Sequence, residues 1–514
     1  MTDATADTVL AAASNRRIIT ASVMAATIMQ SLDSTIANVA LPHMQGELSA
    51  TQDQMGWVLT SYIVAAAITI PLSGWLANAF GRRKVFLASI VLFTVTSALC
   101  GAAVTLPQIV LFRFLQGVGG AALVPLSQAV LFDINDPKDF GRAMAIWAGS
   151  AQAGNIFGPA LGGWLTDNLS WRWVFYINLP IGVLAFVGLL LTMPESRAAK
   201  RPSFDFLGFA TLSLGVTALQ LLLDRGQLLD WFSSPEIVIE AAVAALGFYL
   251  FISHMFTSER PFLNPALFTD RNFVAANAFI FLIGLVLFGS LALLPPMLQN
   301  QFGYPVVLTG LVTAPRGLGT FLGMIIVGRI IGRINVRLIM AAGFLITAFA
   351  LWQMTQFSPQ MGYWPVIVSG LVQGLGIAII YVPASTVAFA TLSGSLRNEG
   401  TALFNLVRNL GSSVGISVVL FLLVQNTQRL HASLGEHVTP YNAAANPAAI
   451  AAHLDPTTAK GRAALDAAIT HQSTFIAYLD DFKLMMVLTL LTLPFLLLVR
   501  DTKPAPGERP HVLE

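Results

Sequence analysis

One carboxylate and one guanidinium stand out because each interrupts a long apolar run. Asp33 lies in the run 18–40 and Arg113 in the run 107–129. A charge at the centre of a bilayer costs about 2.5–3.5 kcal/mol, so it is seldom retained without a use. A nearby cation lowers the pKa of a carboxyl group and burial raises it. We predict that Asp33 binds and releases a proton and that Arg113 adjusts the proton affinity of Asp33. The alternative is a fixed ion pair that only joins two helices.

Four further charged residues are candidates for contact with a substrate or a coupling ion. Arg316 and Arg408 lie inside apolar runs of the second half of the chain, with no carboxylate nearby in the same run. They would attract an anionic compound or be satisfied by backbone carbonyls. Asp224 and Arg225 are adjacent at the end of another run, where a solvated pair at the membrane surface is expected.

Glycines at a spacing of four mark the run 142–164. Its small residues include Gly154, Gly158, Gly162 and Gly163. Such a stripe lets two helix backbones approach closely. Pro159 in the same stretch removes a backbone hydrogen bond and bends the helix. The combination predicts a helix interface that slides or rocks.

Enzymatic and nucleic-acid functions find no support in the sequence. The seven His residues do not pair with a Cys or an acidic cluster at metal-ligand spacing. No GxxxxGK[ST] phosphate cradle is present. The basic residues are scattered and form no continuous basic face. We therefore expect no catalytic site, no metal, no organic cofactor and no nucleic-acid partner. Without a phosphate cradle ATP is not the expected energy source, and the buried Asp33 makes protons the expected coupling ion.

Composition places these residues in a membrane, with lipid as an expected partner. Hydrophobic residues make up 55% of the 514 and charged residues 11%, against about 25% charged in a soluble domain. Most Lys and Arg residues fall in alternate loops, which predicts that both termini are cytoplasmic. Fourteen runs are long enough to span: 18–40, 56–77, 85–105, 107–129, 142–164, 172–192, 206–223, 236–256, 273–298, 306–328, 337–356, 363–389, 400–424 and 482–499.

An internal repeat organises these spans. A constant offset of 257 maps Gln116, Gly117 and Gly119 onto Gln373, Gly374 and Gly376, and Gly154 and Gly158 onto Gly411 and Gly415. We predict an all-α polytopic membrane protein of two like-oriented six-helix bundles plus a two-helix insert, with a substrate path between the bundles. The expected parts are a cytoplasmic N-terminus (1–17), an N-terminal bundle (18–192), linkers with the insert (193–272), a C-terminal bundle (273–499) and a cytoplasmic tail (500–514).

The outer loop 425–481 is long and contains an Ala-rich stretch. It is interpreted either as a short helical cap or docking surface, or as a loosely ordered connector.

Several segments resemble the major facilitator superfamily, in particular the fourteen-helix drug:proton antiporters of the EmrB/QacA type. The resemblance covers about residues 17–424. The segments that carry it are LDSTIANVALP (32–42), GWLANAFGRRK (74–84), RFLQGVGGA (113–121), GNIFGPALGG (154–163), WRWVFYINLPIG (171–182) and LDRGQLLDWF (223–232).

The resemblance implies proton-coupled export of small hydrophobic compounds across a bacterial cytoplasmic membrane. It ties the motif of Arg113 to proton coupling, identifies the segment around Asp33 as a signature of the group and gives the GNIFGPALGG stripe the antiporter form. EmrB-type proteins commonly work with a periplasmic adaptor and an outer-membrane channel, so such partners are implied. The loop motif, associated with gating, spans Gly74, Asn78, Gly81, Arg82 and Arg83.

One position departs from the family pattern. Asn78 stands where the loop motif usually has an Asp that helps to latch the closed state. The latch would lack that charge, whereas the basic residues Arg82 and Arg83 remain available for phosphate headgroups or a neighbouring helix end.

Three other functions stay open. A proton-coupled importer and a dedicated exporter of one substrate would share this fold, although the glycine stripe favours export. A non-transporting membrane sensor would tolerate Asp33→Asn. The scarcity of buried carboxylates, together with Arg316 and Arg408, favours neutral or weakly acidic hydrophobic compounds over dications.

Overall fold

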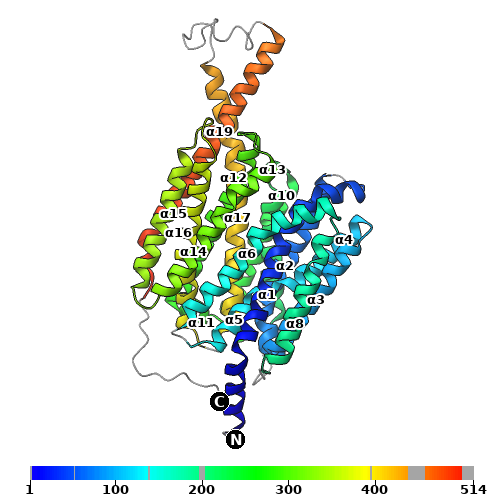
Figure 1. Ribbon diagram of the computed structural model, residues 1–514, viewed down its shortest axis with the longest axis vertical. Coiled ribbons are helices and arrows are strands. Elements are labelled where there is room, and N and C mark those ends of the chain that lie inside the picture. The colour runs from blue at the N-terminus through cyan, green and yellow to red at the C-terminus, as the bar shows by residue number, and fades with distance from the viewer. Residues whose placement is uncertain are drawn as a thin grey trace.

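The chain forms a long bundle of helices (Figure 1). The computed structural model describes residues 3–50, 52–136, 139–195, 203–393, 396–437 and 458–500. Within these residues, 12 helices are long and apolar enough to cross a membrane. They coincide with twelve of the predicted spans. Helices α1 (Asp3–Glu47) and α6 (Phe140–Asn168) cover the other two runs but are not among the 12, so the total of fourteen stays a prediction.

The N-terminal half packs around α1 and α6. Helix α1 lies along both α6 and α8, and α4 lies between α2 and α3. The remaining bounds are α2 (Gln52–Phe80), α3 (Arg82–Ala102), α4 (Leu106–Ala121), α5 (Leu123–Ile134), α7 (Trp173–Tyr176) and α8 (Asn178–Thr192).

The C-terminal half repeats this pairing. Helix α12 lies along α17 as α1 lies along α6, and α16 packs on α14 and α15 as α4 packs on α2 and α3. The bounds are α12 (Arg271–Asn300), α13 (Val306–Thr313), α14 (Pro315–Ile330), α15 (Val336–Thr355), α16 (Trp364–Ala390), α17 (Arg397–Glu436), α19 (Ala459–Leu491) and η5 (Leu493–Leu498).

Glycines related by the offset of 257 face equivalent helices. A Cβ on Gly117 would lie 2.4 Å from the carbonyl oxygen of Tyr62 on α2, and one on Gly374 would lie 2.0 Å from that of Arg316 on α14. The glycines are therefore needed where α4 meets α2 and where α16 meets α14, because any larger residue would separate the two backbones.

An inserted pair of helices lies beside both halves. Helix α9 (Phe206–Arg225) packs on α10 (Pro235–Thr257) and also contacts α2 and α17. The short elements η2 (Trp231–Ser233) and α11 (Ala266–Thr269) follow α9 and α10 respectively.

The described parts of the segment 425–481 are more helical than a loose connector would be. Helix α17 continues to Glu436, and α19 begins at Ala459 rather than near 482, so that predicted boundary is wrong. In Figure 1 the two helices project together from the end opposite the start of α1. His431 on α17 contacts Asp466 on α19 at 3.0 Å. The alanines at the start of α19 favour helix over coil. Residues 438–457 and the predicted tail 501–514 lie outside the described residues.

Candidate functional site

Asp33 and Arg113 form an ion pair inside the N-terminal half. The Arg113 Nη1 atom donates to Asp33 Oδ2 at 2.7 Å. Both side chains are fully enclosed, with 0% and 1% of their surface exposed. The structure thus brings together the two charged residues that the sequence singled out in separate apolar runs, on α1 and α4.

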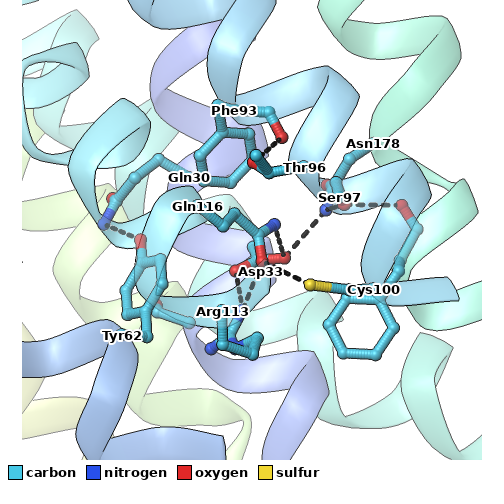
Figure 2. Close-up of polar contacts among 12 residues, drawn as sticks. Gln30, Asp33, Tyr62, Phe93, Thr96, Ser97, Cys100, Arg113, Gln116 and Asn178 are labelled. Carbon is cyan, nitrogen blue, oxygen red and sulfur yellow. Dashed lines mark hydrogen bonds and ion pairs between the residues drawn. The ribbon is translucent and has the colours of Figure 1, made fainter. Parts of the chain in front are cut away.

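Two amides complete the environment of the carboxylate (Figure 2). Gln116 Nε2 and Asn178 Nδ2 both donate to Asp33 Oδ1 at 2.9 Å. Gln116 Oε1 also accepts from Arg113 Nη1 at 2.8 Å. Both oxygens of Asp33 therefore have donors, which is the condition under which a buried charge is tolerated.

The guanidinium of Arg113 is held on its other sides by α2. Its Nε donates to the carbonyl oxygen of Val58 at 3.2 Å, and its Cζ lies 4.3 Å from the ring centroid of Tyr62. These contacts depend on the close approach of α4 and α2 that Gly117 permits. The side chain is consequently fixed by a carboxylate, a carbonyl and an aromatic face.

The glycine stripe places α6 against the turn of α1 that carries Asp33. A Cβ on Gly154 would lie 2.8 Å from the Leu32 nitrogen, and one on Gly158 would lie 2.1 Å from Thr35 Oγ1. Gly162 similarly faces Ile36. The neighbouring Gly163 is partly buried, and α6 runs on through Pro159 to Asn168. The predicted close approach is therefore present beside the ion pair.

The loop motif joins the two halves at the end where α1 begins. Asn78 Nδ2 donates to Glu399 Oε1 at 3.2 Å, and Asn398 Nδ2 donates to Asn78 Oδ1 at 2.5 Å. A Cβ on Gly74 would lie 3.0 Å from the Asn398 carbonyl oxygen. We call this cluster the latch: it comprises Asn78, Arg82, Asp133, Arg397, Asn398 and Glu399.

Arg82 and Arg83 contact protein rather than open surface in the same region. Arg82 is buried, pairs with Asp133 and donates to Asn398 Oδ1 at 2.8 Å. Gly81, which precedes it, has a φ of 90°, a value that favours glycine. Arg83 Nη2 donates to the Leu190 carbonyl oxygen at 2.6 Å, near the end of α8. Arg83 thus matches the predicted contact with a neighbouring helix end.

Asp224 and Arg225 do not form the expected pair. Thr60 on α2 donates to Asp224, whereas Arg225 bonds to Glu236 at 2.6 Å and to Glu240 at 2.9 Å on α10. Adjacent residues on a helix point about 100° apart, so neighbouring helices supply their partners. Asp224 is exposed at the end of α9, as a solvated position requires, but the two residues bond to other helices rather than to each other.

Arg316 and Arg408 occupy different environments. Arg316 is buried, with 5% of its surface exposed, and its Nη2 donates to Ser290 Oγ at 2.7 Å and to the Leu287 carbonyl oxygen at 3.2 Å. Arg408 is half-buried and lies beside Tyr381. Backbone carbonyls were one of the predicted partners of these two guanidinium groups. The prediction is met only for Nη2 of Arg316, which donates to the Leu287 carbonyl oxygen.

Several residues of the site are not predicted as functional candidates from the sequence. Gln116 stands out only as part of the repeat, and Asn178 lies in the segment WRWVFYINLPIG. Glu399 of the latch has no local signal. Away from the site, Asp481 on α19 is 1% exposed, and neither carboxylate oxygen has a hydrogen-bond partner among the described residues. The predicted spans leave Asp481 in a loop because they begin the last helix too late.

Known proteins are similar to this chain in both sequence and fold. Residues 23–416 match the model of the Major Facilitator Superfamily. The chain is 39% identical over 428 residues to the multidrug export protein EmrB of Haemophilus influenzae, covering 83% of this chain and 84% of the relative. It is 38% identical over 438 residues to the fatty acid resistance protein FarB of Neisseria gonorrhoeae, covering 85% and 86%.

A solved structure agrees at the level of the fold. The proton:xylose symporter XylE superimposes with a TM-score of 0.60 at 14% identity, covering 94% of this chain and 96% of the symporter. The family model and the sequence relatives show that the chain belongs to the major facilitator superfamily and is related to EmrB multidrug export proteins.

Proposed function

We propose that the protein exports small hydrophobic compounds across a bacterial cytoplasmic membrane in exchange for protons, through fourteen spans with both termini cytoplasmic. The observation that carries the proposal is the enclosed Asp33–Arg113 pair, since an intramembrane ionisable pair is typical of proton pathways. The names of the EmrB relatives support multidrug export. A periplasmic adaptor and an outer-membrane channel are part of the proposal, with the projecting α17 and α19 as a docking surface.

Asp33 and Arg113 would couple the proton to a change of conformation. In the present arrangement Arg113, Gln116 and Asn178 occupy the carboxylate oxygens. A proton can replace the cation only if α1 and α4 shift, and the glycine contacts of α6 lie beside that turn of α1. One charge moving down 100 mV supplies about 2.3 kcal/mol, enough for roughly a fifty-fold substrate gradient.

The latch supports proton entry from the outer side of the membrane. It joins the two halves at the end proposed to be cytoplasmic. This arrangement fits a conformation closed toward the cytoplasm, in which release of substrate and uptake of a proton occur on the outer side. Breaking the latch would then open the path for the next substrate molecule.

Proton release from inverted membrane vesicles tests the proposal. A pH-sensitive dye would report on a panel of hydrophobic drugs added to wild type, Asp33→Asn and the control Asp167→Asn, an exposed carboxylate on α6, at matched expression. We expect drug-induced proton movement in wild type and in the control, and none in Asp33→Asn.

Each contrary result has a defined meaning. Normal exchange by Asp33→Asn would place the coupling group elsewhere, with Asp224 as the next candidate. A wild type that responds to no drug would remove the multidrug proposal and favour import or a single dedicated substrate.

A further inference from the structure

The C-terminal half contains a buried carboxyl group that the proposed exchange does not use. Asp481 lies on α19 with 1% of its surface exposed, and its two oxygens have no hydrogen-bond partner among the described residues. Asp33 is equally enclosed, but its oxygens accept from a guanidinium and two amides. These two buried carboxyl groups therefore lie in opposite environments.

The face of α19 that carries Asp481 is apolar and points into the bundle. Residues three or four positions apart share one face of a helix, and Ala477, Tyr478 and Met485 on this face are buried. A Cβ on Gly289 of α12 would lie 3.3 Å from the Met485 sulfur. Asp481 is one turn from Met485, so its carboxyl group belongs to the interior of the half rather than to the lipid surface.

Charged residues on the helices packed against α19 supply no bond to this carboxyl group. Helix α19 packs on α12, α15 and α17. Helices α12 and α15 carry a charge only in their first turns, at Arg271 and Arg337. On α17, Arg408 is the charged residue between the latch and the projecting end. The described part of the chain shows no hydrogen bond between any of these groups and Asp481.

Neighbouring residues of α19 provide no counter-charge either. Asp480 and Lys483 are exposed, and the buried Tyr478 is uncharged at neutral pH. Burying an ionised carboxylate without a partner costs far more than burying the neutral acid. The neutral acid is therefore the form of Asp481 that this environment tolerates, whereas the donors around Asp33 suit a carboxylate.

The internal repeat explains why the carboxyl group is left alone. Helix α19 packs on α15 as α8 packs on α3, and the offset of 257 relates α3 to α15. The buried Asn178 of α8 donates to Ser97 Oγ on α3 at 3.0 Å. The offset relates Ser97 to Met354, a fully buried apolar residue. The polar partner available in the N-terminal half is thus replaced by an apolar side chain on α15.

We propose that Asp481 is a second proton-binding group of the protein, located in the C-terminal half and holding its proton in this conformation. The inference rests on the proposed exchange function, to which it adds a proton site that is neutral while Asp33 is paired and ionised. An ionisable side chain inside a membrane span is typical of proton pathways. Separation of α19 from α12 would admit water, the O–H bond of the acid would break, and the proton would pass to water and leave a carboxylate.

Infrared spectroscopy of the purified full-length protein provides the primary test. The C=O stretch of a neutral carboxylic acid lies apart from the bands of a carboxylate, so its presence at neutral pH reports a held proton. We expect this band in wild type, its loss in Asp481→Asn and its retention in Asp480→Asn, the matched control with an exposed carboxylate. Asp481→Glu keeps the acid and should shift the band without removing it.

Two spectroscopic results would overturn the inference: a band unchanged in both Asp481→Asn and Asp481→Glu, or an equal loss in Asp480→Asn. Transport by reconstituted protein separates the inference from the function on which it rests. We expect Asp481→Asn to move fewer protons per drug molecule than wild type does, and an unchanged ratio would overturn the role of Asp481 in exchange. If wild type shows the Asp481 band but exchanges no drug, the export proposal fails while the proton site stands.

Discussion

The two halves of the protein build nearly the same polar cluster and differ in one charge. In the N-terminal half Arg113 and Gln116 donate to Asp33, and in the C-terminal half Arg316 and Gln373 donate to Ser290. The surrounding helices pair in the same way in both halves. Equivalent packing is therefore achieved with and without a carboxylate at this position.

This difference bears on the role of Asp33. If the ion pair served only to join helices, the C-terminal half would need an equivalent pair, yet it packs around a serine. Burying an ion pair also gains little stability over apolar packing. The comparison favours the interpretation that Asp33 is present for its charge and its proton rather than for cohesion.

The largest expected effect on stability comes from removing Arg113, and removing Arg316 provides the comparison. Arg113→Gln leaves Asp33 without its cation and should destabilise the protein by about 3–5 kcal/mol, the cost of breaking a buried pair. Arg316→Gln removes a charge that has no counter-charge among the described residues, so stability should be unchanged or higher. Thermal unfolding of detergent-purified variants measures both. Equal destabilisation by the two substitutions would contradict the asymmetry of the halves, and Asp33→Asn combined with Arg113→Gln should recover most of the loss.

A smaller effect should separate the equivalent glycines of α6 and α17. A Cβ on Gly415 would lie 2.4 Å from the Leu285 carbonyl oxygen, whereas one on Gly158 meets the side-chain oxygen of Thr35. A side chain can rotate away and a backbone cannot, so Gly415→Ala should cost about 1–3 kcal/mol and Gly158→Ala less. A Cβ on Gly310 would have no neighbouring atom within 4 Å among the described residues, so Gly310→Ala is the control. The same unfolding assay applies, and a larger loss for Gly158→Ala would reverse the predicted order.

The smallest effect concerns the latch between the halves. Asn78→Asp restores the residue usual in the family but places a second carboxylate beside Glu399. The repulsion between the two partly buried carboxylates should destabilise the closed conformation by about 1 kcal/mol. In a Cys100→Ser background, a cysteine at Ala145, which faces Gly328 across the halves, reports on opening. Its labelling rate should rise about fivefold.

Glu399→Gln in the same background provides the control for that charge effect. It removes one of the two carboxylates and should return the labelling rate to that of the parent. A rate unaffected by Asn78→Asp would mean that the amide contributes no more to closure than a carboxylate does.

Much of the architecture could be read from the sequence because its signals are local. Apolar runs set twelve of the spans, and the offset of 257 anticipated which glycines face equivalent helices. Asp33 and Arg113 were identifiable because a charge inside an apolar run is costly wherever the helix lies. The start of α19 was not identifiable, because its outer part is polar and lacks the apolar signal used to find spans.

Partner choice was decided by the tertiary structure alone. Asn78 donates a hydrogen bond to Glu399, 321 residues further along the chain. Arg225 forms its ion pair with Glu236 on α10, although Asp224 is adjacent to it in the sequence. The sequence by itself determined the membrane class, the repeat and the buried charges, since composition and spacing fix the cost of placing each residue in lipid. Which side chains then meet depends on the rotation and closeness of packed helices. Only those contacts reveal that Arg316 supplies the cation of the cluster in the C-terminal half. Its partner there, Ser290, is uncharged and leaves the guanidinium without a counter-charge among the described residues.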